Sequence, residues 1–118
     1  SFTTDGWQFR NGEKSAEEHP DTFFIPPASE RANLQVGDFV KVAFEVIGPP
    51  DEAGGEWYPQ GERMWIKVVG RDGPFYVGVW ANTSLLCDVV PALTFGRGVS
   101  FLPEHVISID RPDRGPTE

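Results

Sequence analysis

The 118 residues are enough for one domain with a single hydrophobic core and too few for two such domains. The 13 glycines and 11 prolines predict many turns and exclude long helices. The net charge of −8 leaves no basic footprint for a nucleic acid and disfavours an anionic membrane surface, whereas it would steer a basic partner towards the chain.

A single cysteine, Cys87, makes an intramolecular disulfide impossible, which is typical of a protein from a reducing compartment. No apolar run approaches the ~20 residues that a membrane-spanning helix needs. The sequence also shows no signal-peptide pattern. We therefore expect a cytoplasmic protein.

The first part of the chain, residues 1–21, is polar and rich in turn dipeptides such as Asn11-Gly12, and we interpret it as an N-terminal extension. Trp7 and Phe9 are two positions apart and would share one face of a short strand. The run 17–21 is typical of a loop. At the other end, the polar residues 111–118 predict a frayed tail.

The core is expected over residues 22–110. Within it, 28–33 is the only segment with a convincing helical pattern. From residue 38 apolar side chains recur at every second position, which predicts a strand over 38–47. One face of this strand would carry Val40, Val42, Phe44 and Val46.

Two further strands, 62–70 and 75–81, are separated by a tight turn and predict a hairpin. A long loop is expected over 48–61, and residues 83–93 are ambiguous because their helical spacing is cut short by a proline. The remaining strands are expected at 97–102 and 106–109. Together these segments predict a mainly β domain, a small, strongly bent antiparallel sheet or partly open barrel of about five strands with one short helix.

Two of these segments, 33–42 and 61–68, resemble a known family, and the run Glu62-Arg63-Met64-Trp65 is the most telling part. Together with 78–82 and 96–101, they resemble the YegJ-like family of small bacterial proteins, a domain-of-unknown-function family. The resemblance implies a small β fold and little chemistry. Small acidic bacterial proteins of this kind often resemble immunity proteins that neutralise a co-encoded toxin.

Candidate catalytic residues are few. Cys87 could pair with His19 or His105 as a nucleophile, but no sharp turn presents it, and a small buried hydrophobic residue explains it better. Paired carboxylates for acid–base chemistry could come from Glu52, Glu56 and Glu62, but their hydrophilic surroundings favour a solvated loop. We therefore expect no enzymatic activity.

A metal site could be drawn from the cluster Glu17, Glu18, His19 and Asp21, which offers oxygen and imidazole ligands. A solvated acidic loop explains the same run, and a chain with two histidines and one cysteine favours the loop. We therefore expect no metal and no cofactor.

The aromatic residues of the predicted hairpin leave two alternatives open. Counting along the strands places Trp65, Tyr76 and Trp80 on one face, opposite the aliphatic residues. If the aliphatic face is the core, these rings form an outer patch suited to a protein interface. Alternatively, Trp7 and Phe9 pack over them.

These observations favour a non-enzymatic protein-binding module, most concretely an immunity or antitoxin-like protein that neutralises a basic bacterial toxin. The alternative is a small-molecule-binding or minor enzymatic domain, with a pocket at the sheet mouth lined by Trp65, Trp80 and Glu62. The residues expected to contact the protein partner are Glu17, Glu18, Asp21, Asp51, Glu52, Glu56, Trp57, Tyr58, Trp65, Tyr76 and Trp80.

Overall fold

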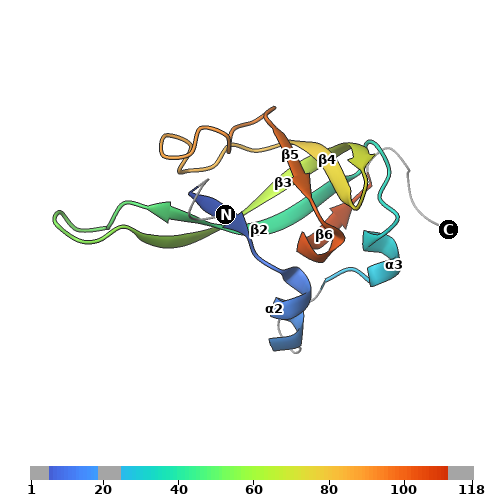
Figure 1. The fold of residues 1–118 in the computed structure, drawn as a ribbon, viewed down its shortest axis with the longest axis horizontal. Coiled ribbons are helices and arrows are strands. Elements are labelled where there is room, and N and C mark those ends of the chain that lie inside the picture. Colours follow the sequence, from blue (N-terminus) through green and yellow to red (C-terminus); the bar gives the residue numbers. More distant parts are fainter. Residues whose placement is uncertain (1–5, 19–24, 112–118) are drawn as a thin grey trace.

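The computed structural model describes residues 6–18 and 25–111 and shows one strongly curled antiparallel sheet, a half-barrel, with short helical segments beside it (Figure 1). The mainly β fold that the alternating pattern predicts is confirmed. The strands are β1 (Trp7–Phe9), β2 (Phe39–Gly48), β3 (Tyr58–Asp72), β4 (Phe75–Trp80), β5 (Gly98–Phe101) and β6 (Val106–Asp110). The helical segments are α2 (Gly12–Glu18), α3 (Ala28–Arg31) and the 3-10 turn η1 (Pro103–His105).

β2 pairs with three other strands, β1, β3 and β6. One of its edges pairs with β3 over the whole length from Phe39 to Gly48. Its other edge is shared, because β1 pairs with the part around Phe44 and β6 with the part up to Val42. From β3 the sheet continues through β4 to β5. Segments from both ends of the described chain therefore meet on one strand.

The predicted face of β2 forms the centre of the core. Its fully buried side chains are Val40, Val42, Phe44 and Val46. Met64 and Ile66 of β3 face the same interior. Trp7 and Phe9 close it from the N-terminal side, with ring centroids 6.1 and 6.3 Å from that of Trp80. The inside of the half-barrel is thus filled by side chains, and these side chains form the hydrophobic core.

A β-bulge in β3 decides which face of the hairpin is buried. Ile66 pairs with Trp80, but the register shifts between Val68 and Gly70, so that Val69 has no partner in the ladder. One extra residue in a strand turns the following side chains to the opposite face. Trp80 therefore lies on the inner face with Ile66, and the parity predicted for it is wrong.

The helix α2 replaces the turn expected at Asn11-Gly12 and part of the loop expected over 17–21. Asn11 caps the helix, because its side-chain oxygen accepts a hydrogen bond from the backbone N–H of Lys14 at 2.9 Å. Gly12 then allows a close approach to β6, since a Cβ there would lie 2.9 Å from the Cγ2 atom of Ile107. The expectation that 28–33 is the only helix is wrong, although α3 itself is confirmed.

Arg31, at the end of α3, holds the helical segments together. Its side chain is 6% exposed, and its Nη1 atom lies 2.6 Å from a carboxylate oxygen of Glu13 in α2. The guanidinium also donates to the backbone oxygens of Pro26 at 2.8 Å and Pro103 at 3.2 Å. A buried arginine of this kind satisfies several acceptors at once, which fixes α2 and η1 relative to α3.

The remaining segments differ from expectation mainly in length. β2 ends one residue later and β3 begins four residues earlier than the pattern predicts, so the loop expected over 48–61 is reduced to 49–57. Residues 83–93 form irregular turns and no helix. The strands expected at 97–102 and 106–109 correspond to β5 and β6. The tail predicted over 111–118 lies, apart from Arg111, outside the described residues.

Candidate functional site

The tip of the β2–β3 hairpin is an exposed acidic loop. The hairpin projects beyond the rest of the molecule as a long arm (Figure 1). Its tip, residues 49–57, carries the exposed carboxylates of Asp51, Glu52 and Glu56. Trp57 is 56% exposed there, although tryptophan is usually well buried. The tip therefore combines negative charge with an exposed indole ring, as the sequence predicts.

Tyr58 and Asp51 stiffen this tip. The phenol oxygen of Tyr58 lies 3.2 Å from both carboxylate oxygens of Asp51 and donates a hydrogen bond to them. The side-chain amide of Gln60 donates to the backbone oxygen of Pro49 at 2.9 Å, which closes the base of the loop. Desolvation and the neighbouring Asp51 charge both raise the pKa of Tyr58. The phenol is a donor at neutral pH with its ordinary pKa of 10, and the raised pKa extends this role into more alkaline solution.

The three rings of the expected outer patch do not lie together. Tyr76 and Trp80 are both 1% exposed and belong to the core, so they are not on an outer face. Tyr76 stacks on Phe101 at a centroid distance of 5.6 Å, and Trp80 lies beneath Trp7 and Phe9. The alternative in which the N-terminal strand packs over these rings is therefore confirmed for Trp80.

Trp65 does lie on the outer face, where it is half-buried. The ammonium group of Lys41, its cross-strand neighbour, lies 5.1 Å from the ring centroid in a cation–π contact. The backbone N–H of Trp65 donates to the side-chain oxygen of Asn82 at 2.8 Å. A shallow hollow of about 260 Å³ borders the ring, next to Phe39. Trp65 therefore keeps part of its ring exposed on the outer face.

The N-terminal acidic residues are separate from the hairpin tip. Glu17 and Glu18 are exposed at the end of α2, while Asp21 lies outside the described residues. In Figure 1 α2 lies below the sheet, well away from the end of the β2–β3 arm. The structure therefore does not bring the two predicted acidic groups onto one surface.

Glu62, considered above for acid–base chemistry, anchors the loop 81–97. Its carboxylate accepts hydrogen bonds from the hydroxyl of Ser84 and, at 3.1 Å, from the backbone N–H of Leu85. The hydroxyl of Ser84 also accepts from the N–H of Leu86 at 2.9 Å. Because Trp80 is in the core and Trp65 is on the other face, these three residues do not line one pocket at the sheet mouth.

The remaining candidates for chemistry are held in structural contacts. His105 stacks on Phe9 at a centroid distance of 4.7 Å, and its Nδ1 atom accepts a hydrogen bond from the N–H of Leu102 at 3.1 Å. Burial lowers the pKa of His105, against the opposing charge of Glu104. Cys87 is half-buried in the loop, and His19 lies outside the described residues. Over 6–18 and 25–111, no three His, Cys, Asp or Glu side chains are grouped closely enough to hold a metal ion.

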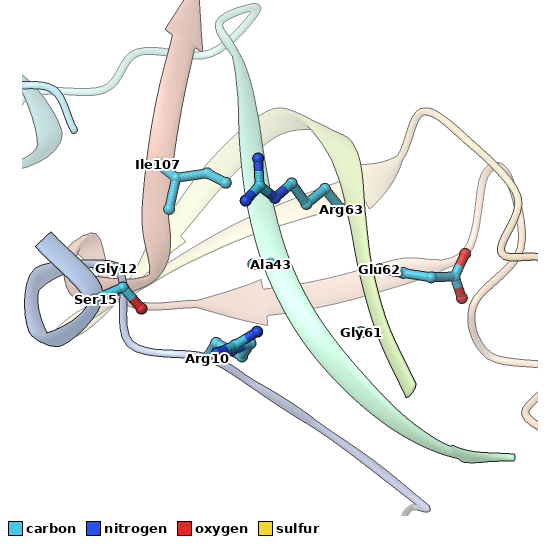
Figure 2. A pocket seen from close by; sticks show the side chains of 8 residues that line it. All are labelled: Arg10, Gly12, Ser15, Ala43, Gly61, Glu62, Arg63 and Ile107. Carbon is cyan, nitrogen blue, oxygen red and sulfur yellow. The ribbon is translucent and has the colours of Figure 1, made fainter. Parts of the chain in front are cut away.

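A groove of about 600 Å³ lies on the outer face of the sheet, beside α2 (Figure 2). Arg10 and Arg63 line it from two sides, and Ser15 of α2 adds a hydroxyl. Ala43 and Ile107 supply the apolar part of its lining. This groove was not expected from the sequence, because its two arginines are far apart along the chain.

Comparison of the chain with protein-family models, curated proteins and solved structures found no match. The resemblance to the YegJ-like family therefore stays a prediction. Among the residues that the structure describes, no helix is long and apolar enough to cross a membrane.

Proposed function

We propose that this chain is a non-enzymatic protein-binding module whose β2–β3 hairpin tip docks on a basic protein surface. The observation that carries the proposal is the exposure of Trp57 among the carboxylates of Glu52 and Glu56 at the end of a projecting arm. Exposed tryptophans are frequent anchors of protein interfaces, and acidic neighbours favour a basic partner and speed its approach.

The stiffness of the tip supports the same function. The Tyr58–Asp51 hydrogen bond and the hydrogen bond from Gln60 to Pro49 support the loop conformation before a partner arrives. A preorganised loop loses less conformational entropy on binding than a flexible one. The net charge of −8 also favours binding, because it attracts a basic protein towards the chain before the two surfaces touch.

The first partner to test is a basic toxin encoded beside this chain, the class that the acidic composition and the family resemblance suggest. Co-purification of the two gene products, followed by titration at low and high salt, measures the association. We expect binding that weakens as salt rises and a loss of about tenfold or more when Trp57 is replaced by Ala.

A matched pair of variants separates the tip from the overall charge. Glu52→Gln with Glu56→Gln removes two charges at the tip, whereas Asp72→Asn with Asp88→Asn removes two exposed charges elsewhere. The tip pair should slow association clearly more than the control pair. Equal effects of the two pairs, or no salt-dependent association with any basic protein, would exclude the hairpin tip as the docking site.

A further inference from the structure

The outer face of β2, β3 and β4 carries apolar side chains that remain partly exposed. In the ladder Lys41 lies opposite Trp65, and Lys67 lies between Phe39 of β2 and Val79 of β4. Residues paired in this way project from the same face of an antiparallel sheet. We call this surface the outer-face patch, and it consists of Phe39, Lys41, Trp65, Lys67, Val77 and Val79. Contiguous exposed apolar surfaces often mark sites of protein interaction.

Two lysines give this patch positive charge on an otherwise acidic chain. Lys67 is exposed and forms no ion pair with any residue in 6–18 or 25–111. The ammonium group of Lys41 contacts the ring of Trp65 and likewise has no carboxylate partner in the described chain. Asp110 pairs with Phe39 from β6, on the side of β2 opposite to Lys67. The two lysines therefore exceed the single charge of Asp110, and the patch would attract a carboxylate group.

The hollow beside Trp65 suits a projecting side chain better than a free ligand. Its volume is about 260 Å³, below the about 300–1,000 Å³ of pockets that hold small organic molecules. Phe39 and Trp65 supply an aromatic lining, and Ala81 adds a small residue directly after the end of β4. Aromatic anchors of protein interfaces commonly insert into hollows of this kind. The patch thus combines a place for a ring with positive charge beside it.

We propose that the outer-face patch binds the hairpin tip of a second copy of this chain, with Trp57 in the hollow and Glu52 and Glu56 beside the two lysines. The tip has the complementary chemistry, since it presents an exposed indole among carboxylates. It also lies at the end of a projecting arm, which brings it within reach of another molecule (Figure 1). Opposite charges on the two surfaces fix the register of such a contact.

This inference rests on the hairpin tip being a docking site, as proposed above, and it adds a second surface that the tip can occupy. Two copies of a chain with a net charge of −8 repel each other over long distances. In about 0.15 M salt, exposed charges more than about 8 Å apart are largely screened, whereas groups in direct contact still interact. We therefore expect weak, concentration-dependent self-association, which occupies the tip and competes with a basic partner.

Sedimentation velocity of the whole chain over a concentration series measures this association. We expect the sedimentation coefficient of the parent chain to rise with concentration. Trp57→Ala removes the anchor, and Lys41→Gln with Lys67→Gln, the double lysine variant, removes the positive charge. Each should weaken association by about tenfold or more. The control Lys14→Gln with Arg97→Gln makes the same charge change at exposed positions outside the patch and should associate like the parent.

A mixing experiment tests whether the tip of one copy meets the patch of another. Trp57→Ala keeps its patch, and the double lysine variant keeps its tip. Neither should associate alone at a concentration where the parent does, whereas an equimolar mixture should form complexes that contain both. A parent chain that stays monomeric, a mixture that stays monomeric, or association that survives Trp57→Ala would each overturn the proposal.

The same variants separate this inference from the docking function. The double lysine variant keeps the tip and should still bind a basic partner. If no basic protein binds but the parent chain self-associates as described, the docking function fails and the inference stands. A monomeric parent chain that binds a basic protein through Trp57 gives the reverse result.

Discussion

Ile66 and Trp80 face each other across β3 and β4 on the inner side of the sheet, and Gly78 lies two residues before Trp80 on that same side. The backbone comes very close here, because a Cβ at Gly78 would lie 2.6 Å from the backbone oxygen of Lys67 and against the side chain of Ile66. The absence of a side chain at Gly78 thus allows the two strands to pack behind the bulge.

Replacing Gly78 by Ala should therefore destabilise the fold, because backbone atoms cannot move away as easily as a side-chain end. We expect the free energy of unfolding, measured by urea denaturation, to fall by about 2–3 kcal/mol. Gly70→Ala is the matched control, since a Cβ there meets nothing within 4 Å. If both variants lost the same stability, the close approach at Gly78 would not be the cause.

Arg31 should contribute to stability through its hydrogen bonds to three different segments. Arg31→Met keeps most of the side-chain volume but removes the donors to Glu13 and to the backbone oxygens of Pro26 and Pro103. We expect a loss of about 2–3 kcal/mol in the free energy of unfolding. Arg97→Met, at an exposed position, should change it by less than about 0.5 kcal/mol. If Arg31→Met left the free energy of unfolding unchanged, the helical segments would be held together by packing alone.

His105 should make the stability depend on pH. Burial lowers its pKa below the ordinary 6.5, so the folded state holds the proton less tightly than the unfolded state. The stabilising contribution is therefore complete above about pH 6.5 and is lost as the pH falls towards the lower folded pKa. We expect the free energy of unfolding to fall less in His105→Gln than in the parent chain when the pH is lowered from 7.5 to 5.5. Urea denaturation at both pH values measures this difference. Parallel pH profiles for the two proteins would rule out this role.

Ser84 should keep the loop 81–97 ordered. Ser84→Ala removes the donor to Glu62 and the acceptor for the N–H of Leu86, both in a buried position. We expect a loss of about 1–2 kcal/mol and faster hydrogen exchange at the amides of Leu85 and Leu86. Ser100→Ala, on the exposed side of β5, is the control and should leave exchange in this loop unchanged.

Hydrophobic periodicity was sufficient to predict the fold class, because β2 is buried on the face that its alternation marks. Periodicity predicted the wrong face for Trp80, because counting every second residue assumes a strand without a bulge. The extra residue at Val69 is an ordinary strand residue, so the sequence does not mark the bulge. Asn11 did carry a readable signal for α2, since asparagine is a preferred N-cap residue and an acidic residue, Glu13, follows in the first turn. The prediction of a turn at Asn11-Gly12 did not take this N-cap signal into account.

The candidate sites were predictable to different degrees. The hairpin tip is local in sequence, so the carboxylates and Trp57 could be named from one run of residues. The groove between Arg10 and Arg63 depends on the pairing of β1 and β3 with opposite edges of β2. A single sequence does not reveal that register, so nothing in it indicates that two arginines far apart along the chain line one groove.

The shared edge of β2 has a consequence for how the chain is made. A ribosome releases β2 long before β6, which must cover part of its edge. Until then the nascent chain presents unpaired backbone groups on an apolar strand, a known starting point for aggregation. The exposure ends only when residues 106–110 have emerged, so a strand far along the chain completes the pairing of β2. We therefore expect translation that stalls before β6 to yield aggregating or degraded chains.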